Sequence, residues 1–240
     1  MIPDRVVEEI RDISHELGFG LEAGSKPALL AILGLTAEDD GYASMPIVCN
    51  GFKDDEYVET VILAAKLGRN IIPVIEQPAE LPRIIRQAER YGVRPSLGVR
   101  IKPVTTGTGR WATSGGNRSK FGLGANDLLE AVTLLREHGM LDCLNLLHFH
   151  VGSQINDVRQ VVSAGGELAH IYCELTGLGA GLRIIDIGGG LGVDYDGSRS
   201  ARDGSVNYGF AEYASSVVHR VQSVCDDAGV PHPTIMSESG

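Results

Sequence analysis

Three short stretches of the sequence carry residue types that could bind a charged, ring-shaped molecule. The first, Ile184 to Ser198, passes from an apolar run into three consecutive glycines, Gly188 to Gly190. Because glycine has no side chain to pack and is costly to order, the trio indicates that something approaches the backbone closely. Successive amides at a strand end can form a nest for a phosphate. A tight turn without a ligand explains this stretch equally well.

The same glycines do not fit a dinucleotide-binding fingerprint. That fingerprint needs G-x-G-x-x-G leading directly into a helix, with an acidic residue about twenty positions later. Here Val193 stands where the third glycine should be, and the polar stretch DYDGSRSARDGS follows instead of a helix. The sequence therefore predicts a phosphate nest or a turn, and not a nucleotide site.

The second stretch, His148 to Gln154, begins with two histidines that would share one face of a strand. An H-x-H pair at a strand end can bind zinc, but a zinc site needs further ligands. The other histidines fall on predicted helices or in a loop, and we expect Asp186 within its strand and not at its end. We therefore predict no metal site. One imidazole could instead offer a flat surface to a ring, with a core histidine as the simpler alternative.

The third stretch, Ser237 to Gly240, ends an apolar strand in a carboxylate. Glu238 is costly to bury without a cationic or protonated partner. A protonated pyridine nitrogen would be one such partner, and Arg100 at the end of LGVR would be another. A phosphate nest, a stacking imidazole and this carboxylate together suit pyridoxal 5′-phosphate, whose ring withdraws electrons while its nitrogen is protonated.

These stretches fall at the ends of strands in one repeating pattern. Every predicted strand but the last is followed by a predicted helix, which implies a parallel sheet, either doubly wound or closed as a (β/α)8 barrel. Both folds place their sites at the carboxyl ends of the strands. For a barrel, one strand is missing. The predicted strands are 19–22, 46–50, 70–76, 96–101, 144–152, 183–190 and 234–238, and the irregular stretch 105–122 suits a loop over a site.

Composition narrows the class of partner. The formal net charge of -10 argues against nucleic acid or an anionic membrane, because both favour a basic surface. The four cysteines are scattered without a CxxC pair, which indicates reduced thiols. The N-terminus lacks the apolar run of a signal peptide, and no later run reaches membrane-spanning length. We predict a cytoplasmic protein that acts on a small molecule.

Six stretches closely resemble the biosynthetic arginine decarboxylases in order and spacing: GLEAGSK, LGVRIK, SKFGL, LLHFHVGSQ, DIGGGLGVDYDGS and SESG. That family belongs to the alanine-racemase-like, fold III enzymes that use pyridoxal phosphate. Ornithine and diaminopimelate decarboxylases usually carry a proline where Ser239 stands. The resemblance implies that residues 1–240 form one partial pyridoxal-phosphate-binding (β/α)8 barrel, with strands two to eight present.

The resemblance also implies roles for individual residues. His150 would stack on the cofactor ring, and Glu238 would pair with the pyridine nitrogen. The other cofactor positions would be Gly188, Gly189, Gly190, Ser153 and Gly240 around the phosphate, and the polar residues Glu22, Arg100 and Lys120. The substrate-binding stretch of the family matches Ile185, Asp186, Ile187, Gly188, Gly189, Gly190, Leu191, Gly192, Val193, Asp194 and Tyr195.

The activity implied is decarboxylation of L-arginine to agmatine and carbon dioxide, for polyamine and spermidine biosynthesis. In this family the lysine that forms the Schiff base would lie upstream of Met1, and a β-domain would follow Gly240. The chain would then hold no catalytic residue and be inactive alone. Magnesium and a homo-oligomer are further family expectations. The alternatives are a diaminopimelate or lysine-type decarboxylase, or a non-catalytic barrel fragment that binds pyridoxal phosphate or another phosphate.

Overall fold

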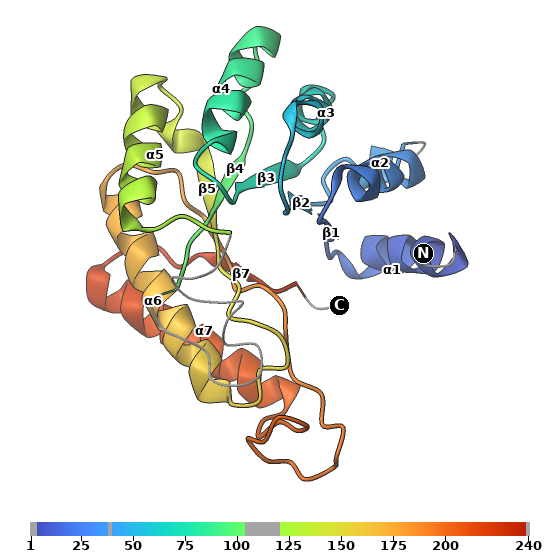
Figure 1. The fold of residues 1–240 in the computed structure, drawn as a ribbon, viewed down its shortest axis with the longest axis vertical. Coiled ribbons are helices and arrows are strands. Elements are labelled where there is room, and N and C mark those ends of the chain that lie inside the picture. The colour runs from blue at the N-terminus through green and yellow to red at the C-terminus, as the bar shows by residue number, and fades with distance from the viewer. Residues whose placement is uncertain (1–3, 38–39, 104–120, 239–240) are drawn as a thin grey trace. The chain divides into compact units, whose positions relative to one another are not determined.

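Strands and helices alternate along the whole chain (Figure 1). The computed structural model describes residues 4–37, 40–103 and 121–238. The chain divides into two compact units, Met1–Gly98 and Val99–Gly240, and each is described by itself. In the described residues, no helix is long and apolar enough to cross a membrane.

In the first unit, three short parallel strands alternate with helices. β2 pairs in parallel with both β1 and β3, with Leu21 opposite Ile47 and Ile47 opposite Ile71. The elements are α1 (Asp4–Leu17), β1 (Leu21–Ala23), α2 (Lys26–Leu35), η1 (Asp40–Tyr42), β2 (Ile47–Cys49), α3 (Asp55–Lys66), β3 (Ile71–Ile75) and α4 (Glu80–Tyr91).

Local sequence signals fix where these helices begin. Asp54 caps α3 by accepting a hydrogen bond from the backbone nitrogen of Tyr57 at 2.7 Å. Ser25 caps α2, and Pro27 follows in the first helical turn, where its missing N–H costs nothing. The helices and strands bury a common apolar cluster made of Ala23, Leu29, Ile32, Tyr42, Met45, Ile47, Cys49, Tyr57, Val61, Ala64 and Ile71.

The second unit repeats the arrangement with longer helices. β6 pairs in parallel with both β5 and β7, and α6 and α7 lie side by side (Figure 1). The elements are β4 (Leu97–Arg100), which crosses the boundary between the units, α5 (Ala125–Glu137), η3 (Leu141–Cys143), β5 (Leu144–His148), α6 (Val158–Gly177), β6 (Ile184–Asp186), α7 (Phe210–Ala228) and β7 (Thr234–Met236).

The predicted alternation and the parallel pairing are confirmed, but the strands are shorter than expected. β5 ends at His148 and β6 ends at Asp186, whereas the sequence pattern continued both runs to a glycine. Gly188 has a φ of +67°, which an extended strand does not allow, so the chain leaves the sheet there. Asp186 is therefore the last residue of its strand, and the expectation that it lies within the strand is wrong.

Candidate functional site

Strand register brings a histidine and an aspartate together at the carboxyl end of the second unit. His148 ends β5 and lies opposite Asp186, which ends β6. Residues in register on parallel strands point to the same face, so the two side chains meet. Nδ1 of His148 lies 3.3 Å from Oδ2 of Asp186, and both side chains are almost completely buried.

Glu238 joins this pair from the neighbouring strand. Asp186 is in register with Met236, and every second residue along an extended chain returns to the same face, which places Glu238 beside it. Oε2 of Glu238 lies 3.9 Å from Nε2 of His148, and the glutamate side chain is 13% exposed. The two carboxylates thus approach opposite edges of one imidazole ring.

Gly188 connects these groups through its backbone. Its nitrogen donates to Oδ1 of Asp186 at 2.9 Å, and its carbonyl accepts from the backbone nitrogen of Glu238 at 2.9 Å. A Cβ at this position would lie 2.5 Å from the carbonyl oxygen of Phe149 and 3.3 Å from Nδ1 of His150. Only glycine fits, and the ring of His150 lies against it.

The next two glycines are equally confined. A Cβ on Gly189 would lie 2.1 Å from the carbonyl oxygen of Glu238, and one on Gly190 would lie 1.8 Å from that of Gly152 and 3.3 Å from Cα of Ser153. The glycine trio therefore packs between the connections that follow β5 and β7. This close approach also gathers His150, Ser153 and Glu238 around it.

The three titratable side chains could be considered as a metal site, since their ligand atoms lie within 4.8 Å of one another. However, the aspartate approaches Nδ1 of His148 and the glutamate approaches Nε2. These nitrogens point in different directions from the ring, so the two carboxylates contact different edges of the imidazole. The three side chains therefore form a row with the imidazole in the middle.

Tyr213, on α7, lies near enough to Asp186 for the two groups to interact electrostatically. Burial raises the pKa of Tyr213 to about 12, with the neighbouring phenol of Tyr208 and the charge of Asp186 acting in the same direction. Tyr213 therefore stays a neutral phenol at physiological pH. It adds no charge beside the buried carboxylate.

The loop after Gly190 is tied to the loop after β5. The side-chain amide of Gln154 donates to the carbonyl of Val193 at 2.7 Å and accepts from the nitrogen of Val193 at 3.0 Å. The hydroxyl of Tyr208 donates to the carbonyl of Ile155 at 2.7 Å and accepts from the nitrogen of Gly192 at 3.2 Å. These contacts hold the stretch 191–195 against the loop that follows β5.

Within the predicted substrate-binding stretch, burial separates the residues into two groups. Ile185, Asp186 and Ile187 are buried, whereas Val193 and Tyr195 are exposed. Asp194 is intermediate in exposure, and its carboxylate accepts a hydrogen bond from the hydroxyl of Ser205 at 2.6 Å. The exposed end of the stretch is the part whose side chains a ligand in solution could reach.

In the first unit, the predicted site residue Glu22 is the middle residue of β1, is exposed, and accepts a hydrogen bond from the side-chain amide of Asn50 at 3.0 Å. Asn50 follows β2 directly, so the pair links β1 to the end of β2. In the second unit, the guanidinium of Arg100 lies 5.9 Å from the centre of the Phe121 ring. The remaining predicted positions, Lys120 and Gly240, lie outside the described residues.

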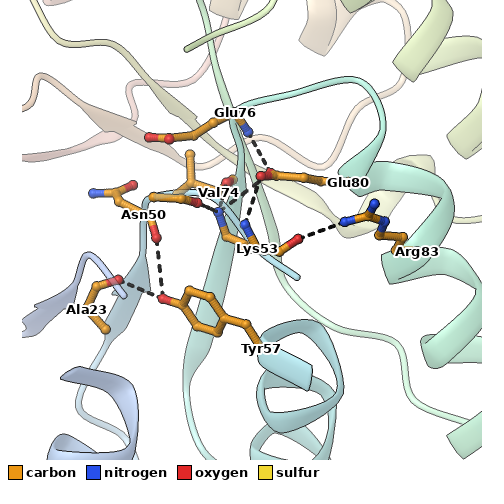
Figure 2. A network of polar contacts seen from close by, with 9 residues as sticks. Ala23, Asn50, Lys53, Tyr57, Val74, Glu76, Glu80 and Arg83 are labelled. Carbon is orange, nitrogen blue, oxygen red and sulfur yellow. Dashed lines mark hydrogen bonds and ion pairs between the residues drawn. The ribbon is translucent and has the colours of Figure 1, made fainter. Parts of the chain in front are cut away.

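A buried polar network beneath Asn50 holds these strand ends (Figure 2). Lys53 is completely buried, and its Nζ donates to the carbonyls of Gly51 at 2.7 Å and Val74 at 2.5 Å. Nζ also lies 3.6 Å from Oε2 of Glu80, which is buried to the same degree. Burial lowers the pKa of the Lys53 amine, and the charge of Glu80 opposes that shift.

Glu80 and Tyr57 extend the network to the backbone. The carboxylate of Glu80 accepts from the backbone nitrogens of Lys53 at 3.1 Å and Glu76 at 2.9 Å. The hydroxyl of Tyr57 contacts the carbonyls of Ala23 at 2.8 Å and Asn50 at 3.3 Å (Figure 2). The network thus joins the carboxyl ends of β1, β2 and β3 to the start of α4. It fixes the edge of the sheet that carries Glu22.

Comparison with known proteins agrees with this geometry. The family model described as "Pyridoxal-dependent decarboxylase, pyridoxal binding domain" matches residues 6–240. The biosynthetic arginine decarboxylase of Rhodopirellula baltica is 54% identical over 235 residues, which cover 98% of this chain and 34% of that protein. The protein of the same name from Citrifermentans bemidjiense is 47% identical over 236 residues, which cover 98% of this chain and 36% of the relative. The chain spans about a third of the length of these relatives.

Solved structures give the same result. The biosynthetic arginine decarboxylase of Campylobacter jejuni matches with a TM-score of 0.83 and 35% identity, over 98% of this chain and 37% of that one. Diaminopimelate decarboxylase of Helicobacter pylori, solved with L-lysine, matches with a TM-score of 0.75 and 24% identity over 97% of this chain and 54% of the other, which shows the shared fold. The fold is the pyridoxal-phosphate-binding α/β barrel, and the chain belongs to the pyridoxal-dependent decarboxylase family.

The described residues fit the cofactor of this family. Gly189 packs against Glu238, and Gly190 packs against Gly152 and Ser153, which brings backbone amides, a serine and a carboxylate to the same strand ends. Successive amides of this kind can bind a phosphate. The amide of Gly188 already donates to Asp186, so it supports the site from behind. The pairing of Asp186 with His148 was missed in the sequence because it depends on the register of two strands, which the residues of each strand alone do not set.

Proposed function

We propose that this chain is the pyridoxal-phosphate-binding domain of an arginine decarboxylase, which converts L-arginine to agmatine and carbon dioxide. The observation that carries the proposal is the convergence of His150, Ser153, Gly189 and Glu238 at the ends of β5, β6 and β7. The names and identities of the similar proteins support the choice of reaction.

Each of these residues has a distinct task in the proposed site. The amides of Gly189 and Gly190 and the hydroxyl of Ser153 bind the phosphate, which anchors the cofactor. His150 presents a flat imidazole to the ring. Glu238 accepts a hydrogen bond from the protonated ring nitrogen. When bound, pyridoxal phosphate supplies an electron sink that stabilises the negative charge left after carbon dioxide departs.

The exposed end of the stretch 185–195 suits contact with the substrate. Asp194 offers a carboxylate fixed by Ser205, and Tyr195 offers an exposed phenol. A carboxylate is the natural partner of a guanidinium, because the two groups form charge-assisted hydrogen bonds. We therefore propose that Asp194 and Tyr195 contact the side chain of the substrate.

A chimera tests the reaction. This chain would replace the matched segment of the Rhodopirellula baltica relative, and carbon dioxide release would be measured from arginine, lysine, ornithine and diaminopimelate. We expect turnover of arginine in preference to the other three, and loss of turnover by at least ~10²-fold in the Glu238→Gln chimera, a size typical of a lost charge-stabilising contact. Preference for diaminopimelate or lysine, or inertness toward all four, would contradict the assignment.

The proposal also includes the compartment and the assembly. Cys49, Cys143, Cys173 and Cys225 are all free thiols, which suits the reducing cytoplasm. We infer a homo-oligomer for the working enzyme, as the family resemblance implies. Sedimentation velocity of the active chimera measures this, and a monomer at assay concentration would contradict it.

A further inference from the structure

His148 has no task in the site as proposed so far, yet its side chain is almost completely buried there. Its Nδ1 and Oδ2 of Asp186 are both shielded from solvent and face each other at 3.3 Å. Neither atom makes a hydrogen bond of good geometry with any described residue. Buried polar atoms usually have partners, so a small rotation that completes the Nδ1–H to Oδ2 bond would satisfy both.

The opposite edge of the same ring faces Glu238. Its Nε2 lies 3.9 Å from Oε2 of the glutamate, within the range of an ion pair. Asp186 cannot move freely, because Gly188 donates to its other oxygen at 2.9 Å. The same glycine holds the backbone nitrogen of Glu238 at 2.9 Å. The ring is therefore fixed at one edge and directed toward the glutamate at the other.

We propose that His148 is a positioning residue which, oriented by Asp186, holds the Glu238 carboxylate in the place and charge state that the cofactor ring nitrogen requires. This inference rests on the proposed function of Glu238. Nδ1–H of His148 donates to Oδ2 of Asp186. Nε2 must also carry a proton, because only a donor can hold a carboxylate, and it donates to Oε2 of Glu238. The chain of groups Asp186–His148–Glu238 thus links the wall of the barrel to the cofactor.

Two substitutions separate positioning from simple packing. The amide nitrogen of an asparagine can lie near the place of the histidine Nδ1, so His148→Asn keeps a donor for Asp186 but removes the edge that faces Glu238. His148→Phe removes both contacts. The matched control is His232→Asn, because His232 forms an exposed pair with Asp226 at 2.7 Å on the surface.

Four measurements are made on the 240-residue chain. The first is the ¹⁵N shift of the His148 ring nitrogens without cofactor, which reports which nitrogen carries a proton. The second is the dissociation constant for pyridoxal phosphate by fluorescence titration. The third is the ¹⁵N shift of the ring nitrogen of bound, labelled pyridoxal phosphate, and the fourth is the melting temperature.

We expect protons on both Nδ1 and Nε2 in the wild type, and a proton on Nε2 alone in Asp186→Asn. His148→Asn should recover most of the melting temperature lost in His148→Phe. It should still bind pyridoxal phosphate about 10-fold more weakly than the wild type, equal to about 1.4 kcal/mol. It should also move the cofactor nitrogen toward the unprotonated shift. His232→Asn should change none of these values.

Two results would overturn the inference. An unprotonated Nδ1 in the wild type would show that Asp186 does not orient the ring. Recovery by His148→Asn of both the affinity and the cofactor nitrogen shift would show that His148 only supports Asp186. A wild-type chain that does not bind pyridoxal phosphate contradicts the proposed function itself, and the role of His148 with it. The histidine shift still decides the contact with Asp186 separately.

Discussion

At the scale of single residues, close backbone contacts explain why an apolar strand is followed by three glycines. Each Cβ added there would collide with the backbone of an adjoining connection, at Phe149, Glu238 or Gly152. The glycines are thus required by the packing of the strand ends. The sequence predicted a close approach. It could not show that the first partner is the protein's own backbone.

Replacing Gly190 with alanine should therefore lower the unfolding free energy by more than its left-handed backbone conformation alone explains. Gly190 has a φ of +86° and no room for a Cβ, whereas Gly197 has a φ of +72° and open space around it. Gly197→Ala should cost about 1–2 kcal/mol of unfolding free energy, the usual cost of a left-handed alanine. Gly190→Ala should cost at least about 2 kcal/mol more, because the backbone must shift. Urea unfolding of both variants measures the difference, and equal costs would contradict the packing.

At the scale of elements, the strands and helices followed from the sequence because each signal is local. Apolar runs bounded by polar residues predicted the seven strands that the described residues form. The ends of β5 and β6 were misplaced because apolar residues such as Phe149 and Ile187 continue past the sheet and stay buried. The Lys53 network was also missed, since a lysine after a strand usually faces solvent.

The buried network at the ends of β1 to β3 predicts a large and pH-dependent effect. Lys53→Met leaves the Glu80 carboxylate buried without its cation, which should cost about 3–5 kcal/mol. The exposed pair between Lys26 and Glu56 is the control, and Lys26→Met should cost much less than Lys53→Met. Urea unfolding of both variants at neutral pH measures the two costs. Similar costs would show that the network contributes no more than a surface pair.

The sign of the pH dependence follows from the lowered pKa of Lys53. Below its ordinary value of 10.5, the unfolded chain binds more protons at this amine than the folded one. The unfolding free energy therefore rises as the pH increases toward 10.5. The difference between wild type and Lys53→Met should grow from about pH 7 to pH 10, across the range where lysines titrate. A difference that stays constant or shrinks would contradict the buried, perturbed amine.

At the scale of the whole molecule, the family was predictable from the sequence, but the contacts among the buried side chains of the site were not. Motifs such as HFHVGSQ and DIGGGLGVDYDGS resemble those of the arginine decarboxylases in order and spacing, so the family followed from them. The His148–Asp186 contact depends instead on the register of two strands, which no local pattern sets. The sequence also suggested one domain over residues 1–240, and within the structure two compact units share that length.

The most direct test of the account is the affinity of this chain for pyridoxal phosphate, with and without the Glu238 carboxylate. Glu238→Gln should raise the dissociation constant about 10-fold or more, since a hydrogen bond to a charged group contributes about 1.5–3 kcal/mol. Glu137→Gln, at the exposed end of α5, should leave it unchanged. Fluorescence titration of the three proteins decides. Equal affinity of wild type and Glu238→Gln, or no binding by the wild type, would contradict the assignment of these strand ends as the cofactor site.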